Sequence, residues 1–513
     1  MRVWFGPLGR LVSVRSTLNV EAIVFLAFVA CLLTSQNVTI ARSSASLSDT
    51  RQRVLLSLIS ISAALAFVPG VTCPFLFDDY RHLMFAINES WHDLLNRVIV
   101  NHPTGGDHFF RPLGDFAILG IYDIAHFDFT LWHLAGILTH VVNTLLVFFL
   151  AKRTCHGGSG WLGPVAASLF FGWHASHVEA VNWLSAFYDL LATFFVLLVL
   201  LEVTTARHTV WRYACLCFAS ILACVSKESA FCLPFLAAII TLLEPLRARP
   251  LAWRKTLASA VACAVVFLFR FWYLGGLGGY YKSAENPSAA HLHAPSVLQA
   301  LGFRLWAILF VPLNWSDPPG LLLKLAFTGL AFAVVGFALM ASLKPKRAAL
   351  LALFILCAAL PAISILLIGP DLAGARILYL PSVGLALMWA EVAESVPNPK
   401  LSAAFCGLLL AFQVTALVHN ELLWEPVAQT ARQACRDAAA YLRTDPSLKI
   451  FGLDLPRYRN GVYFLQNAFP FCVAINGSVD DKRIDFGNEL PKIPVPHQHI
   501  AHWDDATGRL IIN

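Results

Sequence analysis

Two adjacent carboxylates, Asp78 and Asp79, follow an apolar run in the stretch PFLFDDYRHL. A carboxylate at membrane depth costs about 2.5 to 3.5 kcal/mol on insertion scales, so a pair there indicates a function. If the two share a cavity, their repulsion raises the proton affinity of one, which could then act as a general base. The alternative is a helix cap or a solvated acidic pair. The pair could also recruit a divalent cation such as Mg²⁺ or Mn²⁺, but no further ligand is evident.

Three basic residues are candidates for holding an anion. Arg111 in FFRPLGDF carries a planar guanidinium that can hold two phosphate oxygens, and Arg376 in GARILYLPSVG is a second cation of this kind. Both could instead be interfacial anchors whose side chains snorkel. Lys227 and Glu228 in SKESAF interrupt an apolar hairpin, where a structural ion pair is at least as good an interpretation as a catalytic role.

The stretch WHASHVEAVNW is polar inside an otherwise apolar region and contains His174, His177 and Glu179. The two histidines are three positions apart and could share a helix face, but no third ligand with firm spacing is present, so we predict no metal site. We predict that they donate to an anionic group, with Glu179 as a positioning carboxylate that also belongs to the substrate-binding residues. Capping of two short helices is the alternative interpretation.

The composition predicts an integral membrane protein. Of 513 residues, 58% are apolar and 13% are charged, and the apolar runs are too long and numerous for one soluble core. The net charge of +6 is dispersed in short clusters, which argues against a nucleic-acid partner. The 12 cysteines lie mostly in apolar runs and show neither metal-ligand spacing nor a disulfide framework.

A helix needs about 20 apolar residues to cross a bilayer. The runs predict about eleven core spans, near residues 54–73, 131–151, 161–173, 187–204, 212–226, 229–244, 256–274, 320–343, 348–368, 377–393 and 401–419. The run 297–313 contains Arg304 and is predicted to lie along the interface. Residues 20–36 form a further apolar run, which could be an extra N-terminal span, a signal-like segment or the product of a misplaced start codon.

Basic clusters fall in alternate connections, which are therefore predicted to be cytoplasmic. The candidate residues all lie in the opposite connections, which face a periplasm or a lumen. The spans 161–173 and 212–226 are too short for an average bilayer, and both lead into polar motifs. A cavity in the outer half of the membrane would explain both observations.

The hydropathy falls after residue 420. PVAQTARQACRDAAAYLR has helical spacing, and KIFGLDLP, GVYFLQNAF and RLIIN have the character of strands. We therefore predict an all-α polytopic membrane protein with a small C-terminal α/β outer domain. Its predicted parts are an N-terminal extension (1–53), a transmembrane catalytic domain (54–420) and a soluble domain on the periplasmic or luminal side (421–513).

The motifs resemble those of a known superfamily when they are taken in order. The Asp-Asp pair, then Arg-Pro-Leu, His-x-x-His-x-Glu-Ala, Lys-Glu and Arg-x-Leu-Tyr-Leu-Pro-Ser, resemble the GT-C glycosyltransferases. The likeness is greatest to the transmembrane and tetratricopeptide-repeat O-mannosyltransferases and covers about residues 54–420. No repeats follow the last span here, so the chain is similar to a bacterial-type relative, and a protein acceptor is not assured.

The resemblance implies transfer of a sugar, by analogy mannose, from a polyprenyl-phosphate donor to an acceptor hydroxyl on a protein or glycan at the outer membrane face. It gives the base role to Asp78, with Asp79 adjacent. It places the following residues where they could surround the donor phosphate: Arg111, His174, His177, Lys227 and Arg376. The implied location is a bacterial inner membrane with the site facing the periplasm, or the ER membrane in a eukaryote.

The chemistry agrees with these roles. A lipid-phosphate leaving group departs as an anion, so the transition state needs cations more than a general acid. A single displacement with one base inverts the anomeric carbon, whereas a double displacement also needs a carboxylate nucleophile, and we favour inversion.

Two other classes of function are compatible with the sequence. A transporter or flippase of lipid-linked sugars would line a path to both faces with polar residues, but here the motifs lie on one side. A scaffold acting through the C-terminal part would need an exposed apolar patch there.

Overall fold

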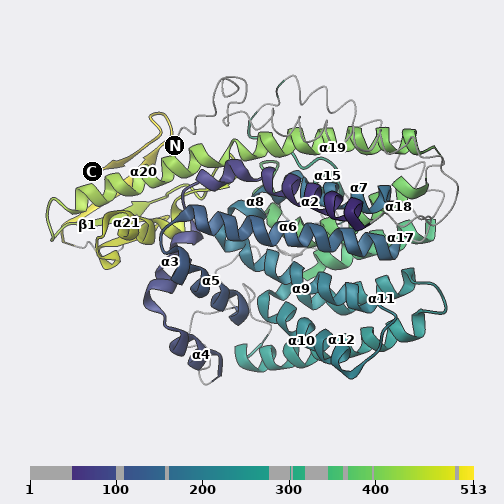
Figure 1. Ribbon diagram of the computed structural model, residues 1–513. Coiled ribbons are helices and arrows are strands. Elements are labelled where there is room, and N and C mark those ends of the chain that lie inside the picture. Colours follow the sequence, from purple (N-terminus) through teal and green to yellow (C-terminus); the bar gives the residue numbers. More distant parts are fainter. Residues whose placement is uncertain are drawn as a thin grey trace.

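Helices make up most of the chain, and a small sheet lies at one end of them (Figure 1). The computed structural model describes residues 49–99, 109–155, 161–276, 301, 304–317, 320, 345–361, 368–395, 398–490 and 496–513. These residues are largely helical, with several apolar helices of membrane length and a mixed sheet near the C-terminus. The predicted class, a helical membrane protein with a small C-terminal α/β part, is confirmed.

Five helical segments in the described part of the chain are long and apolar enough to cross a membrane. They are Phe129–Thr154, Leu184–Val203, Arg249–Leu274, Ala375–Ser395 and Lys400–Leu442. Two more apolar segments, Val210–Ser226 and Glu228–Leu243, are shorter. The bundle elements are α2 (Asp49–Leu65), α3 (Asp78–Asn88), α4 (Trp91–Ile99), α5 (Pro112–Ala125), α6 (Phe129–Thr154), α7 (Leu162–Gly172), α8 (Val178–Asn182), α9 (Phe187–Val203), α10 (Val210–Ser226), α11 (Leu233–Leu243), α12 (Arg249–Leu274), α15 (Leu305–Phe310), α17 (Pro345–Ala359), α18 (Tyr379–Ser395) and α19 (Pro399–Glu421).

The prediction of short spans before the polar motifs agrees with the structure, since α7 has 11 residues and α10 has 17. The predicted span at 20–36, and that at 320–343 apart from residue 320, lie outside the described residues. The run 297–313 is described in part and contributes α15. The helical segment Lys400–Leu442 continues past residue 420, so the chain enters its C-terminal part through a long helical arm.

The helix α6 illustrates how the sequence sets both ends and both faces of a span. Asp128 caps its N-terminus by accepting a hydrogen bond from the Thr130 N–H at 2.9 Å, and two basic residues stand in its last turn. One face is exposed and apolar, as Leu138 shows, while His140 and Asn143 are buried against other helices. An exposed leucine face on a membrane-length helix is suited to lipid.

The C-terminal part combines two helices, α20 (Trp424–Leu442) and α21 (Phe469–Gly477), with a sheet of order β4-β1-β5-β6. The strands are β1 (Lys449–Leu453), β4 (Ile484–Gly487), β5 (Gln498–Asp504) and β6 (Arg509–Ile512). Strand β1 is parallel to both β4 and β5, whereas β6 is antiparallel to β5. A separate hairpin pairs β2 (Tyr458–Arg459) with β3 (Val462–Tyr463). The predicted helix and the strands at KIFGLDLP and RLIIN are confirmed, whereas GVYFLQNAF provides only two strand residues before α21 begins.

A disulfide joins Cys435 of α20 to Cys472 of α21. The sequence indicated no disulfide framework, and that expectation is wrong at this one pair. The two cysteines lie 37 positions apart in a stretch with no regular cysteine spacing, so the pairing depends on how the two helices pack.

The C-terminal part lies at the same end of the bundle as α3 (Figure 1). Phe77, which precedes α3, packs against Tyr463 of β3 with ring centroids 5.0 Å apart. Tyr463 in turn stacks on Trp183, at 4.2 Å between ring centroids. The candidate polar residues therefore meet at the junction between the helices and the C-terminal part.

Candidate functional site

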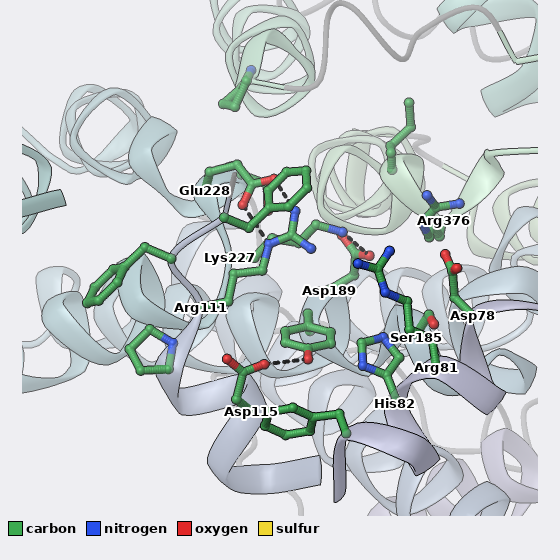
Figure 2. Close-up of a pocket in the computed structure, with 18 of the residues that line it drawn as sticks. Asp78, Arg81, His82, Arg111, Asp115, Ser185, Asp189, Lys227, Glu228 and Arg376 are labelled. Atoms are coloured by element: carbon green, nitrogen blue, oxygen red, sulfur yellow. Dashed lines mark hydrogen bonds and ion pairs between the residues drawn. The ribbon is translucent and has the colours of Figure 1, made fainter. Parts of the chain in front are cut away.

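A cavity of about 460 Å³ lies at this end of the helices. Four of the residues singled out from the sequence line it together: Asp78, Arg111, Lys227 and Arg376 (Figure 2). They come from α3, the start of α5, the break before η6 (Glu228–Cys232) and η10 (Ala375–Leu378). Residues far apart in the sequence thus converge on one space. Glu179, His174, His177 and Asp79 do not line it.

The two adjacent aspartates differ in their surroundings. Asp79 is buried, and its carboxylate accepts hydrogen bonds from the Leu76 N–H at 3.0 Å and the Ser185 N–H at 3.1 Å. Asp78 lines the cavity, and its carboxylate makes no hydrogen bond or ion pair with a described residue. Asp79 therefore ties the first turn of α3 to the segment before α9, while the Asp78 carboxylate is left available to a substrate.

Phe77 introduces this pair with unusual backbone geometry. It is buried, and its φ of 43° lies in the left-handed region, which a bulky side chain adopts rarely. Such a conformation persists where the surrounding structure stabilises it. Here the Phe77 ring packs on Tyr463, and Asp79 is held by hydrogen bonds from the backbone N–H groups of Leu76 and Ser185. The turn directs Asp78 toward the cavity and Asp79 away from it.

Burial raises the pKa of Asp78 above its ordinary value, and the positive charges of Arg81, Arg376 and Arg457 partly oppose this. Burial raises the pKa of Asp79 well above the usual range, and hydrogen bonds from the backbone oppose the shift. A carboxyl with a raised pKa is a better proton acceptor when it is ionised, so the shift at Asp78 suits a general base.

Arg111 is held by Glu228. Its Nε donates to Glu228 at 2.8 Å, and a second guanidinium nitrogen contacts the other carboxylate oxygen, so the pair is bidentate. Arg111 stands directly before Pro112, which begins α5 and is suited to the first turn of a helix. The structural ion pair foreseen in SKESAF thus involves Glu228, but its partner is Arg111 and not the neighbouring Lys227.

Lys227 pairs instead with Asp189 of α9, with 2.5 Å between its Nζ and the carboxylate. Its own position lies between α10 and η6, where the helix breaks. Both charges line the cavity. A charge buried in a helical bundle needs such a counter-charge, because leaving one partner alone is costly.

Arg376 contacts one acidic side chain and two aromatic side chains. It forms an ion pair with buried Glu179, which also accepts a hydrogen bond from the Gly374 N–H at 2.7 Å. Its guanidinium lies over the Trp183 ring, 4.5 Å from the centroid, and donates to the Tyr463 hydroxyl at 3.0 Å. Glu179, which the sequence suggested as a positioning carboxylate, thus holds Arg376.

The hairpin that carries Tyr463 docks closely on the loop before Arg376. Gly461 has a φ of 76°, and a Cβ there would lie 1.9 Å from the Asp371 carbonyl oxygen. Only glycine fits both the backbone angle and the close approach. The C-terminal part is thereby held against η10, and Tyr463 is kept within reach of the guanidinium.

His174 and His177 do not reach the cavity. Both are fully buried: His174 bonds to the Ser176 hydroxyl at 2.8 Å and the Leu309 carbonyl at 2.9 Å, and His177 bonds to the Ser382 hydroxyl at 2.8 Å. The bonded ring nitrogens link the segment after α7 to α15 and α18, while the buried His177 Nδ1 has no hydrogen-bond partner among the described residues. The structure therefore does not bring them together with the four cavity residues.

Several lining residues did not stand out in the sequence. Arg81 and His82 lie three and four positions after Asp78 and so share its face of α3, a spacing that was available as a signal. Figure 2 shows the Arg81 guanidinium between Asp78 and the Lys227–Asp189 pair. The Arg81 guanidinium has no hydrogen bond or ion pair with a described residue. Burial and the Arg81 charge lower the pKa of His82 to about 3, so its ring is neutral.

Asp115 and Tyr188 form a further polar pair on the wall, with the Tyr188 hydroxyl donating to Asp115 at 2.7 Å. No group of three or more His, Cys, Asp or Glu side chains with a geometry suited to a metal ion occurs in the described part of the chain. Among the described lining residues there are one free carboxylate, one free guanidinium and four cations held by carboxylates, the fourth being Arg97, which pairs with Glu89.

No family model matches this sequence, and neither does any curated protein. Two solved structures of ArnT from Cupriavidus metallidurans are similar to it. The structure bound to undecaprenyl phosphate is 14% identical with a TM-score of 0.42, and the apo structure is 13% identical with a TM-score of 0.44. Each match covers 90% of this chain and 94% of the other. At such low similarity, we base the function on the residues of this chain.

Proposed function

We propose that the protein is a GT-C type membrane glycosyltransferase that moves a sugar from a polyprenyl-phosphate donor to an acceptor hydroxyl. The single observation that carries this proposal is the Asp78 carboxylate, which has no hydrogen bond or ion pair with a described residue and lies on the wall of a cavity that Arg81, Arg111, Lys227 and Arg376 also line. A free acid beside several cations is the pairing that this reaction needs. The motif resemblance to the O-mannosyltransferases supports the same conclusion and suggests mannose as the sugar.

In the proposed step Asp78 accepts the proton of the acceptor hydroxyl as its oxygen attacks the anomeric carbon of the donor sugar. The bond between that carbon and the phosphate oxygen breaks, and its electron pair leaves with the phosphate. Arg81 has its hydrogen-bond donors available, so it is the first ligand of the departing anion. Arg111, Lys227 and Arg376 add positive potential from their paired positions.

Two features support a location on the outer side of the membrane. The Cys435–Cys472 disulfide lies in the C-terminal part, at the cavity end of the helices, and disulfides persist in oxidising compartments. Lys152 and Arg153 stand at the last turn of α6, while the residues near its first turn belong to the cavity end. Both agree with a site facing the periplasm of a bacterial inner membrane, or the lumen of the ER.

The division into 1–53, 54–420 and 421–513 belongs to the same proposal. Tyr463 suggests that residues 421–513 do more than bind an acceptor, because this residue contacts Arg376 from outside the helices. The acceptor, a protein or a glycan, would then enter between the helices and the C-terminal part.

The test compares Asp78→Asn with the wild-type protein, using purified protein, radiolabelled polyprenyl-phosphate mannose and a membrane extract as the source of acceptor. We expect transfer to fall at least a hundredfold in Asp78→Asn, because general-base catalysis contributes about 10² to 10⁴. Asp485→Asn is the matched control, since Asp485 is exposed on β4 at the edge of the sheet. Full transfer by Asp78→Asn, with Asp485→Asn also active, would refute the base role.

A further inference from the structure

A second cavity, of about 250 Å³, lies where α20 and α21 meet the starts of α3 and α6. Its lining is Pro74, Phe75, Tyr80, Phe127, Phe129, Arg432, Arg436, Ile475 and Asn476. None of these residues lines the Asp78 cavity, so this site is independent of the proposed sugar transfer. Its wall combines two guanidinium groups with aromatic rings.

The charges on this wall are not balanced. Arg432 and Arg436 lie one helical turn apart on the same face of α20, and no carboxylate is among the lining residues. Arg432 donates to the amide oxygen of Asn476 at 3.3 Å, and neither arginine forms an ion pair with a described residue. The cations of the Asp78 cavity, by contrast, are mostly held by carboxylates. Two neighbouring arginines without counter-charges are suited to a phosphate.

The rest of the lining is suited to a hydrocarbon chain. Phe127 is 49% exposed, and Phe129 opens the membrane-length helix α6. Beyond it, Leu134 and Leu138 of α6 are exposed apolar side chains, as expected for a surface in contact with lipid. The two arginines therefore lie beside the end of a span, at the depth where lipid headgroups are found.

The cavity is also held in shape by a covalent bond. Cys435 stands next to Arg436 on α20, and its disulfide partner Cys472 lies one turn before Asn476 on α21. The Asn476 amide oxygen accepts a hydrogen bond from Arg432, and Tyr80 of α3 lines the cavity beside it. The polar groups of the two helices are thus fixed relative to each other before any ligand arrives.

We propose that this second cavity binds the phosphate of an anionic membrane phospholipid, with Arg432 and Arg436 on the phosphate and Phe127 against the first part of an acyl chain. The lipid would fill the junction between the bundle and the C-terminal part. A free phosphate has the same headgroup chemistry but no chain, so the two sources can be separated by experiment.

The experiment uses the full chain, purified in detergent and stripped of lipid, with phosphatidylglycerol binding measured by native mass spectrometry. We expect Arg432→Gln/Arg436→Gln to weaken binding about thirtyfold, which corresponds to about 1 kcal/mol for each basic residue at a lipid surface. Arg509→Gln is the matched control, because Arg509 is an exposed arginine on β6. Arg432→Lys/Arg436→Lys should retain most of the binding, which guards against a loss caused by misfolding.

Two further arms identify the ligand. Phe127→Ser should weaken phosphatidylglycerol binding several-fold, and inorganic phosphate at the same concentration should not displace the lipid. Equal phosphatidylglycerol affinity in the wild-type protein and in Arg432→Gln/Arg436→Gln would overturn the proposal. So would inorganic phosphate that binds as tightly as the lipid, because the site would then be a free-phosphate site.

Discussion

Arg81→Gln is the substitution that best tests binding of the donor phosphate without a loss of protein stability. Arg81 lines the Asp78 cavity, is exposed, and has no side-chain hydrogen bond or ion pair with a described residue, so its removal breaks no ion pair. Arg376 differs in this respect. Its removal would strand Glu179, which is buried, and breaking a buried ion pair in this way costs about 3 to 5 kcal/mol of stability.

The size of the Arg81 effect follows from its exposure. Two unit charges about 4 Å apart attract by about 1 kcal/mol in water and about 4 kcal/mol at an effective dielectric constant near 20. Because Arg81 is open to solvent on one side, we take about 1 to 2 kcal/mol for its contribution to binding the donor phosphate. This corresponds to a loss of about 5-fold to 30-fold in kcat/KM for the donor.

The assay varies the labelled polyprenyl-phosphate sugar at a fixed amount of acceptor extract. We expect Arg81→Gln to lose the full amount and Arg81→Lys to lose less, since lysine keeps the charge but not the planar fork. The midpoint of thermal unfolding should stay close to that of the wild-type protein, and Arg509→Gln should behave as wild type in both measurements. An unchanged kcat/KM in Arg81→Gln would show that the donor phosphate does not bind beside α3.

Three further predictions follow from the same site. Burial raises the pKa of Asp78 above its ordinary value of 3.8, and only the ionised carboxylate can act as the base. In a pH profile of the wild-type protein, kcat/KM should therefore fall as the pH drops through this raised pKa. The residual activity of Asp78→Asn should not show this fall. Asp79→Asn should lower the free energy of unfolding by about 1 to 3 kcal/mol, because an amide has one oxygen and cannot replace both carboxylate oxygens that accept from the Leu76 and Ser185 N–H groups. An unaltered midpoint of thermal unfolding in detergent would contradict this. Tyr463→Phe removes the hydroxyl that accepts a hydrogen bond from Arg376 but keeps the ring that stacks on Trp183. We expect kcat/KM for the donor to fall roughly fivefold, which corresponds to about 1 kcal/mol, while the midpoint of thermal unfolding changes little. A large loss of stability without a kinetic effect would indicate that Tyr463 has a packing role alone.

The sequence predicted the helices well because their signal is local. A membrane-length apolar run specifies a helix whatever it packs against, since each backbone polar group must be satisfied within its own segment. The polar breaks at Asp78 and Lys227 were visible for the same reason, because charge is conspicuous in an apolar chain. The convergence of Asp78, Arg111, Lys227 and Arg376 on one cavity agrees with their predicted common side.

The partners of these charges could not be read from the sequence. Lys227 and Glu228 are neighbours, yet they pair with Asp189 and Arg111, because each partner is set by which helices meet. His174 and His177 show the converse limit. Their local pattern is that of a polar site, but His174 bonds to the Leu309 carbonyl and His177 to the Ser382 hydroxyl, both of which belong to distant segments. Hydrogen-bond satisfaction over such sequence distances depends on the tertiary structure.

The pairing of the cations also bears on the stereochemistry. A double displacement needs one carboxylate as nucleophile in addition to an acid or base, whereas a single displacement with inversion needs one base. Four carboxylates are among the lining residues of the Asp78 cavity: Asp78, Asp115, Asp189 and Glu228. Asp115 accepts from Tyr188, while Asp189 and Glu228 hold cations, so each of these three is engaged. Recruiting one as a nucleophile would release a buried cation or tyrosine, which is consistent with our proposal of inversion with Asp78 as the base.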